Sequence, residues 1–139
     1  MNDTLPLMKY AIEYLSKFNS SKKNLERILK NKIMRMKIEK KEKFILYNSI
    51  SQTLFKLEEN RFIDDANYSL SKIRFFAKNG KSKIYIKSYL IQKGVEKSII
   101  SNSILEYDEL NIDWEKNSAF TFFRKKRLTK EPENYQKNL

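Results

Sequence analysis

Apolar residues recur with helical spacing along most of the chain, and one helical pattern occurs three times. The first copy reads Ile12-x-Tyr14-Leu15-x-Lys17, and a shift of 61 residues gives Ile73-x-Phe75-Phe76-x-Lys78. A further shift of 47 residues gives Phe120-x-Phe122-Phe123-x-Lys125. Repeated helical units bury their apolar faces against each other and leave an extended outer surface for binding. The pattern therefore predicts a divergent helical repeat, with a chance match of apolar periodicity as the alternative.

The same periodicity, together with capping residues, predicts where each helix begins and ends. Thr4–Pro6 can open the first helix, Ser21 can cap the second, and Asp64 or Asp65 can cap the fourth. The first three expected helices run from Thr4–Pro6 to Phe18, from Lys22 into a charged connection that ends by Lys43, and from Ile45 to Glu59. The next three run from Asp64 or Asp65 to Asn79, from Ser82 to Lys93, and from Val95 to Tyr107. A seventh passes through Trp114, Phe120 and Phe123, and a further helix is expected over 131–139.

Both glycines of the chain, Gly80 and Gly94, fall just after predicted helices. A helix often ends on a residue with left-handed backbone, which is least costly for glycine. The predicted fold class is therefore all-α, with tandem three-helix repeat units that form an elongated, curved array. The expected units cover residues 1–60, with a long basic second helix or connection, then 61–110, and then 111–139 as an incomplete third unit.

Composition and charge narrow the class of partner. Of 139 residues, 29 are Lys or Arg and 17 are Asp or Glu, which gives a net charge of +12. Such an excess attracts polyanions through the summed field of the protein, so nucleic acid, an acidic protein surface and anionic lipid all remain open. With 40% hydrophobic residues the chain can support a core, and two Gly and two Pro fit long helices.

Several classes of chemistry are excluded by residue type. The chain has no Cys and no His, which removes disulfides, thiol nucleophiles, Cys/His zinc sites and imidazole catalysis. The N-terminus lacks the features of a secretory signal, and the longest uncharged stretch, Phe44 to Phe55, is too short and polar to span a bilayer. We expect a cytoplasmic protein.

No motif in the sequence indicates catalysis. The tight acidic pair Asp64-Asp65 has no further ligands at compatible positions, so a helix cap is the preferred interpretation over a metal site. Gly80-Lys81-Ser82 resembles the end of a phosphate-binding loop, but the upstream glycine is missing. We expect no enzymatic activity, no metal and no cofactor.

Basic residues form three clusters, each following a copy of the repeated pattern. Clustered cations of this kind can contact phosphates, and the alternative is a solvated helix face. The aromatic residues of the pattern are interpreted as core rather than as platforms for stacking bases. The clusters are Lys22, Lys23, Arg27, Lys30 and Lys32; Arg74, Lys78, Lys81, Lys83 and Lys87; and Arg124, Lys125, Lys126 and Arg127.

The central part of the chain contains two motifs with several characteristic residues between them. The motifs are Phe62-Ile63-Asp64-Asp65-x-x-Tyr68 and Leu90-x-x-Lys93-Gly94-Val95, and the residues between them are Arg74, Lys78, Gly80, Ser82 and Ile86. Together they resemble the signature of the RecX family of regulatory proteins. Ala11-x-x-Tyr14-Leu15, with Ser21 and Leu25, resembles the family's opening unit, and Phe123-Arg124-Lys125-Lys126-Arg127-Leu128 resembles the start of its third. The resemblance covers roughly Leu7 to Lys130.

The resemblance implies a three-helix-repeat protein that binds the recombinase RecA. Family members lodge in the groove of the RecA filament on single-stranded DNA and usually restrain ATP hydrolysis and strand exchange, without a cofactor. This chain departs from the pattern in having Tyr68 where a Phe is usual, a long basic segment from Lys32 to Lys43, and a third unit that stops at Leu139.

The resulting hypothesis is a monomeric regulator of RecA in recombination, DNA repair and the SOS response. It binds the filament, and single-stranded DNA directly or through the filament. The alternative is a stand-alone nucleic-acid-binding module related to helix-turn-helix proteins. The residues expected to contact RecA or DNA are Arg74, Lys78, Lys81, Lys83, Lys87, Arg124, Lys125, Lys126 and Arg127, whereas Asp64, Asp65, Gly80 and Gly94 are expected to serve the architecture.

Overall fold

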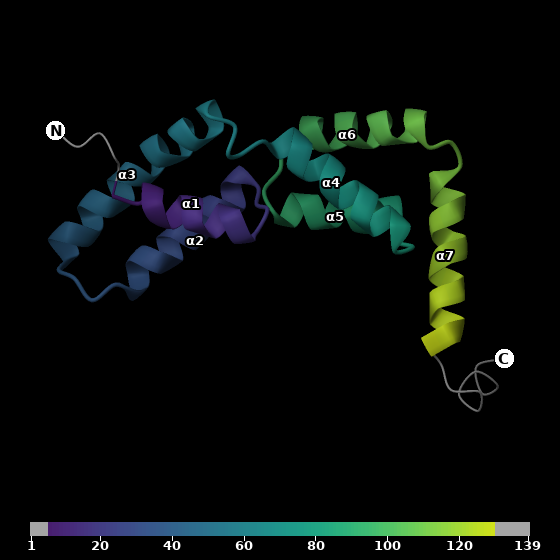
Figure 1. Ribbon diagram of the computed structural model, residues 1–139, viewed down its shortest axis with the longest axis horizontal. Helices are drawn as coiled ribbons and strands as arrows, with labels where there is room; N and C mark the ends of the chain where they lie inside the picture. The colour runs from purple at the N-terminus through teal and green to yellow at the C-terminus, as the bar shows by residue number, and fades with distance from the viewer. Residues whose placement is uncertain (1–5, 130–139) are drawn as a thin grey trace. The chain divides into compact units, whose positions relative to one another are not determined.

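The computed structural model describes residues 6–129, and that part of the chain is folded into seven α-helices without strands (Figure 1). The all-α prediction is confirmed. The proposed first-helix cap at Thr4 and the expected helix over 131–139 lie outside the described residues. The helices are α1 (Met8–Lys17), α2 (Lys22–Arg35), α3 (Lys40–Glu59), α4 (Asp65–Lys78), α5 (Lys83–Gln92), α6 (Lys97–Leu110) and α7 (Trp114–Thr129).

These helices form two compact units. Among the described residues, the first unit runs to Tyr68 and takes in Lys93–Val95, and the second comprises Ser69–Gln92 and the chain from Glu96 onward. Three helices precede residue 60, three lie between 61 and 110, and α7 follows. The division of the sequence into three repeat units remains a prediction.

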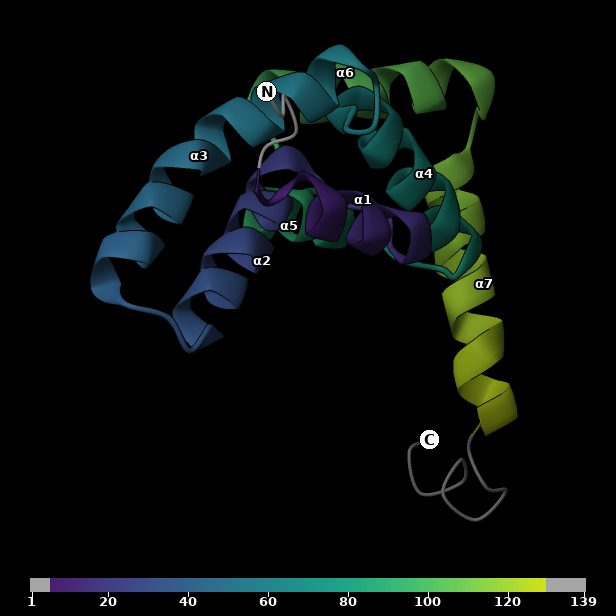
Figure 2. The same ribbon diagram turned by 60° about the vertical axis from the view of Figure 1, so that its left-hand side comes forward.

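The core of the first unit is built from one face each of α1, α2 and α3. Leu25, Leu29 and Ile33 are fully buried at intervals of four residues along α2, so they form one continuous apolar stripe. Figures 1 and 2 both show α1 beside α2. The stripe belongs to one buried cluster together with Leu7, Ala11, Ile50, Leu54, Leu57 and Ile63.

The core of the second unit is centred on α4, α5 and α6. Ile73 on α4 and Ile86 and Leu90 on α5 are fully buried, and Ile100 and Ile104 of α6 are nearly so. The ring of Phe76 meets those of two α5 tyrosines edge to face, with centroids 5.3 Å from Tyr85 and 4.7 Å from Tyr89. Such edge-to-face pairs add stability beyond the area they bury.

Several helix starts differ from the predictions, and α6 begins at Lys97 rather than at the expected Val95. The first helix begins at Met8 rather than near Thr4–Pro6, with Leu7 in the capping position and no side-chain cap. The third begins at Lys40, five residues before the expected Ile45. Lys and Glu have high helix propensity, so the charged stretch before Ile45 is helical rather than a connection.

Helix boundaries in the two units follow the 61-residue repeat. α1 and α4 end at Lys17 and Lys78, and α2 and α5 begin at Lys22 and Lys83. The matching residues in the second helices, Leu25 and Leu29 against Ile86 and Leu90, are all buried. The first helices match less well, since Ile12 is 37% exposed while Ile73 is fully buried. α7 continues to Thr129, beyond the point where α1 and α4 stop.

The predicted role of both glycines at helix ends is confirmed. Gly80 and Gly94 have φ angles of 81° and 79°, in the left-handed region that disfavours side chains. The end of α4 is a Schellman motif, in which Lys81 N–H donates to the carbonyl of Phe76 and Gly80 N–H donates to that of Ala77. Each glycine also allows a close approach. A Cβ on Gly80 would lie 2.5 Å from the backbone nitrogen of Phe122, and one on Gly94 would lie 2.3 Å from Cβ of Lys23.

The Gly94→Ala variant is expected to lower the free energy of unfolding by about 2 kcal/mol or more. The left-handed backbone alone costs an L residue roughly 1–2 kcal/mol, and the contact with Lys23 adds to this. Urea denaturation followed by circular dichroism measures the change. The control, Ser101→Ala at an exposed position of α6, should stay within about 0.5 kcal/mol of the parent protein. A Gly94→Ala variant as stable as this control would contradict the assignment.

Candidate nucleic-acid interface

Three segments that are distant in sequence meet at the start of α2, within the first unit. Ser21 caps this helix, because its Oγ accepts a hydrogen bond from Asn24 N–H at 3.2 Å. The same hydroxyl donates to the backbone carbonyl of Lys93 at 2.5 Å. Ser21 itself is fully buried, and the groups at the other ends of its two bonds leave each bond partly buried. We call the group Ser21, Lys22, Asp65, Lys93 and Gly94 the α2 junction.

The two aspartates of the acidic pair cap different helices. Asp64 Oδ1 accepts the N–H of Asn67 at 3.1 Å and so caps α4, which confirms the predicted cap at this pair. Asp65 Oδ1 instead accepts the N–H of Lys22 at 2.9 Å, at the first residue of α2. Burial raises the pKa of the Asp65 carboxyl, and the hydrogen bond from Lys22 opposes that rise. The pair is therefore architectural, as expected for Asp64, Asp65 and Gly94.

Asparagine at position 65 is expected to destabilise the fold less than alanine at neutral pH. Because the folded-state pKa of Asp65 is raised, its contribution to stability is fully present below the ordinary value of 3.8 and declines as the pH rises through the folded-state value. Asp65→Asn keeps an acceptor for Lys22 without a buried charge, so its stability should depend less on pH in this range. Asp65→Ala loses the acceptor and should cost about 1 kcal/mol.

Urea titrations of both variants between about pH 3 and pH 7 check this ordering. Loss of stability at pH 7 in Asp65→Asn equal to that in Asp65→Ala would contradict it.

One of the candidate contact residues, Lys83, takes part in the packing of the second unit. Its Nζ lies 2.8 Å from Asp108 Oδ2 and 5.4 Å from the ring centroid of Trp114. The indole N–H of Trp114 donates to the other oxygen of Asp108. Lys22, the matching residue of the first unit, pairs with Glu58 at 3.0 Å near the end of α3. The first lysine of α2 and that of α5 thus each join an acid near the end of the next helix.

Loss of the lysine at position 83 is expected to affect stability more than loss of the one at position 22. The Lys83 and Asp108 side chains are 27% and 31% exposed, whereas the Lys22 and Glu58 side chains are 41% and 45% exposed. Lys83→Ala should lower the free energy of unfolding by about 1 kcal/mol, and Lys22→Ala by less than about half of that, because solvent screens the exposed pair.

Trp114 is the single tryptophan of the chain, so its fluorescence reports on this contact. Lys83→Ala should change the emission of the folded protein, and Lys22→Ala should not. Unchanged emission in both variants would contradict the placement of Lys83.

Several of the remaining cations surround a hollow beside α7. The hollow has a volume of about 520 Å³ and is lined by residues from the end of α4, the α4–α5 turn and α7. Figures 1 and 2 both show α7 beside α4. The lack of a side chain at Gly80 lets the turn lie close to the backbone of Phe122. We call this cavity the basic–aromatic hollow. Its lining residues are Phe75, Phe76, Asn79, Lys81, Phe122, Lys125 and Lys126.

The lining combines exposed rings with positioned cations. Phe75 and Phe122 are 59% and 42% exposed. The ammonium of Lys126 lies 5.4 Å from the ring centroid of Phe122. Lys125 donates a hydrogen bond to Oδ1 of Asn79, whose own Nδ2 donates to the carbonyl of Phe75 at 2.7 Å. The site therefore offers flat apolar faces next to positive charge.

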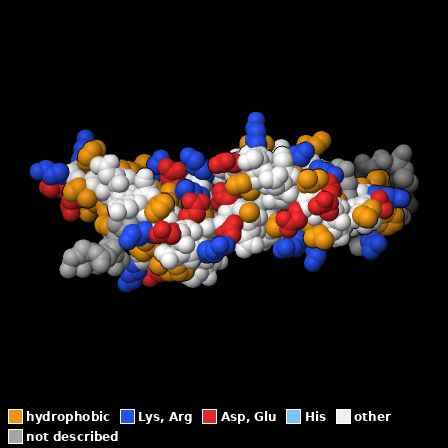
Figure 3. All heavy atoms as spheres, turned by 90° about the horizontal axis from the view of Figure 1, so that it is seen from above, with side chains coloured by type: hydrophobic (Ala, Val, Ile, Leu, Met, Phe, Trp, Pro, Cys, Tyr) orange, Lys and Arg blue, Asp and Glu red, His pale blue; other side chains and the backbone are white. Residues whose placement is uncertain are grey.

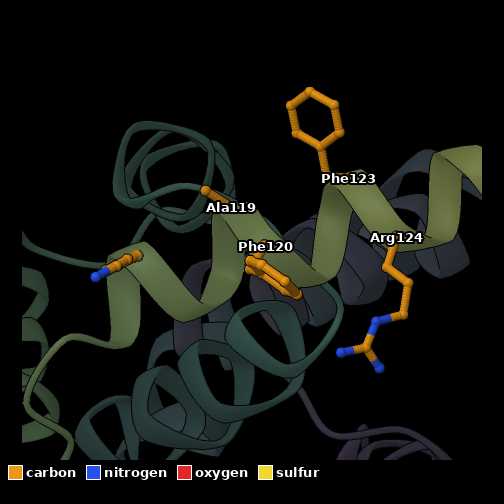
Figure 4. Close-up of a pocket in the computed structure, with 5 residues that line it drawn as sticks. Ala119, Phe120, Phe123 and Arg124 are labelled. Carbon is orange, nitrogen blue, oxygen red and sulfur yellow. The ribbon is translucent and has the colours of Figure 1, made fainter.

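Two further hollows lie on other sides of α7. One, of about 610 Å³, is lined by Lys116, Ala119, Phe120, Phe123 and Arg124 (Figure 4). Figure 4 shows the side chains of Phe120 and Phe123 leaving the helix in different directions. The guanidinium of Arg124 lies 5.7 Å from the ring centroid of Phe120. The other hollow, of about 570 Å³, shares Lys81 and Phe122 with the basic–aromatic hollow.

The predicted contact residues are thus divided by the structure. Lys81, Lys125 and Lys126 line the basic–aromatic hollow, and Arg124 lines its neighbour. Lys78 borders a separate hollow of about 270 Å³ with Trp114. Arg74 and Lys87 are exposed on α4 and α5. The side chain of Arg127 lies outside the described part of the chain.

The prediction that the repeated aromatic residues are core is wrong for the third copy. Phe120, Phe122 and Phe123 are 67%, 42% and 71% exposed. In the second copy Phe76 is buried while Phe75 is exposed. Adjacent residues on a helix point about 100° apart, so a Phe-Phe pair cannot fit wholly into one narrow buried stripe. That spacing is the signal by which the exposed rings could have been found.

The charges elsewhere do not single out one further site. On the face that Figure 3 shows, Lys and Arg side chains are interspersed with acidic and hydrophobic ones. Among residues 6–129, no group of acidic side chains is arranged to hold a metal ion. Within the same range, no helix is long and apolar enough to cross a membrane.

The described part of the chain is thus an all-helical protein whose surface has a hollow lined by aromatic rings and lysines. Comparison with known proteins narrows this class. No family model matches the chain. Regulatory protein RecX of Bacillus cytotoxicus is 31% identical over 92% of this chain, as is that of Bacillus mycoides, and RecX of Bacillus cereus strain B4264 is 32% identical over the same share. In each case the matched region is 41% of the relative's length.

A solved structure of regulatory protein RecX has the same fold. It superimposes with a TM-score of 0.62 and 22% identity, over 94% of this chain and 60% of that one. The resemblance to RecX indicated by the Asp-Asp and Lys-Gly motifs is therefore confirmed. The chain is similar to the RecX regulatory proteins over most of its own length, and it spans about two-fifths of the length of the curated relatives it matches.

Proposed function

We propose that this chain regulates the RecA recombinase by binding its filament on single-stranded DNA and restraining ATP hydrolysis and strand exchange. It would thereby act in homologous recombination and DNA repair. The observation that carries the proposal is the similarity to proteins named RecX, which extends over 92% of the chain. The relatives are named as regulatory proteins, which favours a role through binding rather than catalysis.

The chemistry of the surface supports this proposal. A filament on single-stranded DNA presents phosphates, and the chain carries 12 more positive than negative charges. Cations of the second unit, among them the half-buried Lys81 and the exposed Arg124 and Lys125, line hollows together with exposed aromatic rings of α7. Contact with phosphates through such side chains needs no precise motif and weakens steeply with salt.

The protein is expected to lower the single-stranded-DNA-dependent ATPase rate of its cognate RecA when added at substoichiometric amounts. The charge-reversal variant Arg124→Glu/Lys125→Glu should need at least tenfold more protein for the same inhibition, because it places negative charge against phosphate or acidic protein. A coupled ATPase assay over a wide titration measures both effects.

The matched control is Lys40→Glu/Lys41→Glu at the start of α3, which changes the net charge equally at two exposed positions of the first unit. Retained inhibition in this control locates the effect on α7. An ATPase rate that is unchanged by the parent protein would refute the proposal, and tight binding to DNA without RecA would then favour a stand-alone nucleic-acid-binding module.

A further inference from the structure

We propose that the basic–aromatic hollow seats one unpaired nucleotide of a single-stranded nucleic acid. Its base stacks against Phe122 and Phe75, and the adjoining phosphates lie against Lys81, Lys125 and Lys126. This inference deepens the proposed function and rests on it, since it identifies a place where the chain itself contacts the strand within the filament.

The rings of the hollow are suited to a base. Phe75 and Phe122 come from different helices, α4 and α7, and both line the same cavity. Phe75 and Phe122 are 59% and 42% exposed, so a bound base can bury part of each ring surface, which is favourable. Bases stack on such rings regardless of sequence, because every base has a flat π-face.

The cations of the hollow are suited to a phosphodiester. Three ammonium groups share the lining with the two rings, and the described residues that line it include no carboxylate. Lys125 is held by Asn79, whose amide is in turn fixed on the carbonyl of Phe75. This chain of hydrogen bonds ties one cation to the backbone of Phe75, whose ring lines the same hollow. The charge is thus preorganised before a strand arrives.

The geometry favours a single strand over a duplex. A base in a duplex has both faces covered by its neighbours, so it can enter the hollow only after unstacking. The volume of about 520 Å³ lies within the range of sites for small ligands, which one nucleotide would fill. The neighbouring hollow of about 570 Å³ shares Phe122 and Lys81 and adds Tyr85, so the next nucleotide along the strand meets a similar environment.

Binding of a fluorescent oligothymidylate, measured by anisotropy between about 50 and 200 mM salt, tests the inference. Phe122→Leu and Phe75→Leu should each weaken binding by at least about fivefold without changing its salt dependence, because a stacking surface is lost and no charge. Lys125→Gln should lower the slope of log affinity against log salt by about 0.7, as expected for one phosphate contact on a single strand.

Controls separate stacking from general effects. Phe55→Leu, at a ring 60% exposed on α3, and Lys41→Gln, at an exposed position of the same helix, should leave both affinity and slope as in the parent protein. An abasic oligomer of the same length should bind the parent and Phe122→Leu equally, because it has no base to stack.

Equal weakening of the abasic and thymidylate oligomers by Phe122→Leu would overturn the inference, as would binding that no variant of the hollow affects. Inhibition of the RecA ATPase that is lost in Phe122→Leu while oligomer binding persists would overturn it too, and would assign the hollow to a protein surface instead. The RecA assay with the parent protein tests the proposed function separately, so failure of the inference can be told apart from failure of the proposed function.

Discussion

The first unit depends on how the exposed backbone at the start of α2 is satisfied. The first amide groups of a helix have no partner within it, and here two of them are partly buried against other segments. Ser21 and Asp65 supply the acceptors, and the hydroxyl of Ser21 also binds the carbonyl of Lys93. Residues far apart in the sequence are thereby fixed at one helix end. Gly94 follows at once because the backbone there must turn against Lys23. Asp65, Lys93 and Gly94, which belong to the motifs shared with RecX, therefore stabilise the α2 junction, and this role does not identify a binding partner.

Much of the fold could be predicted from the sequence, because its signals are local. The helices followed from apolar periodicity, and the glycines marked two helix ends. Ser21 and one of the pair Asp64 and Asp65 were identified as caps. The partner of Asp65 could not be predicted, since nothing in the local sequence indicates that its carboxylate reaches Lys22. The start of α3 at Lys40 was missed for a different reason: a run of charged residues shows no apolar stripe, yet it has a high propensity for helix.

The candidate site was predicted only in part. Its basic residues were identified as clusters in the sequence. A cluster in the sequence does not distinguish a cation that takes part in packing from one that can contact a ligand. Lys83 is paired with Asp108 across helices, whereas Lys125 is held by an amide next to an exposed ring. The aromatic half of the site was interpreted as core, because a repeat of apolar positions was taken to mean a repeat of burial. The second helices of the two units obey that rule and the first helices do not, as Ile12 and Ile73 show.

The contact between Gly80 and Phe122 has a consequence for how the site can change over time. Main chain lies against main chain there, so the gap between the turn and α7 is fixed by atoms that every amino acid shares. Side chains around the rim can then be exchanged without narrowing or widening the opening. The aromatic and basic residues that line the hollow could thus be substituted in related proteins while the width of its opening stays the same, provided that position 80 remains glycine.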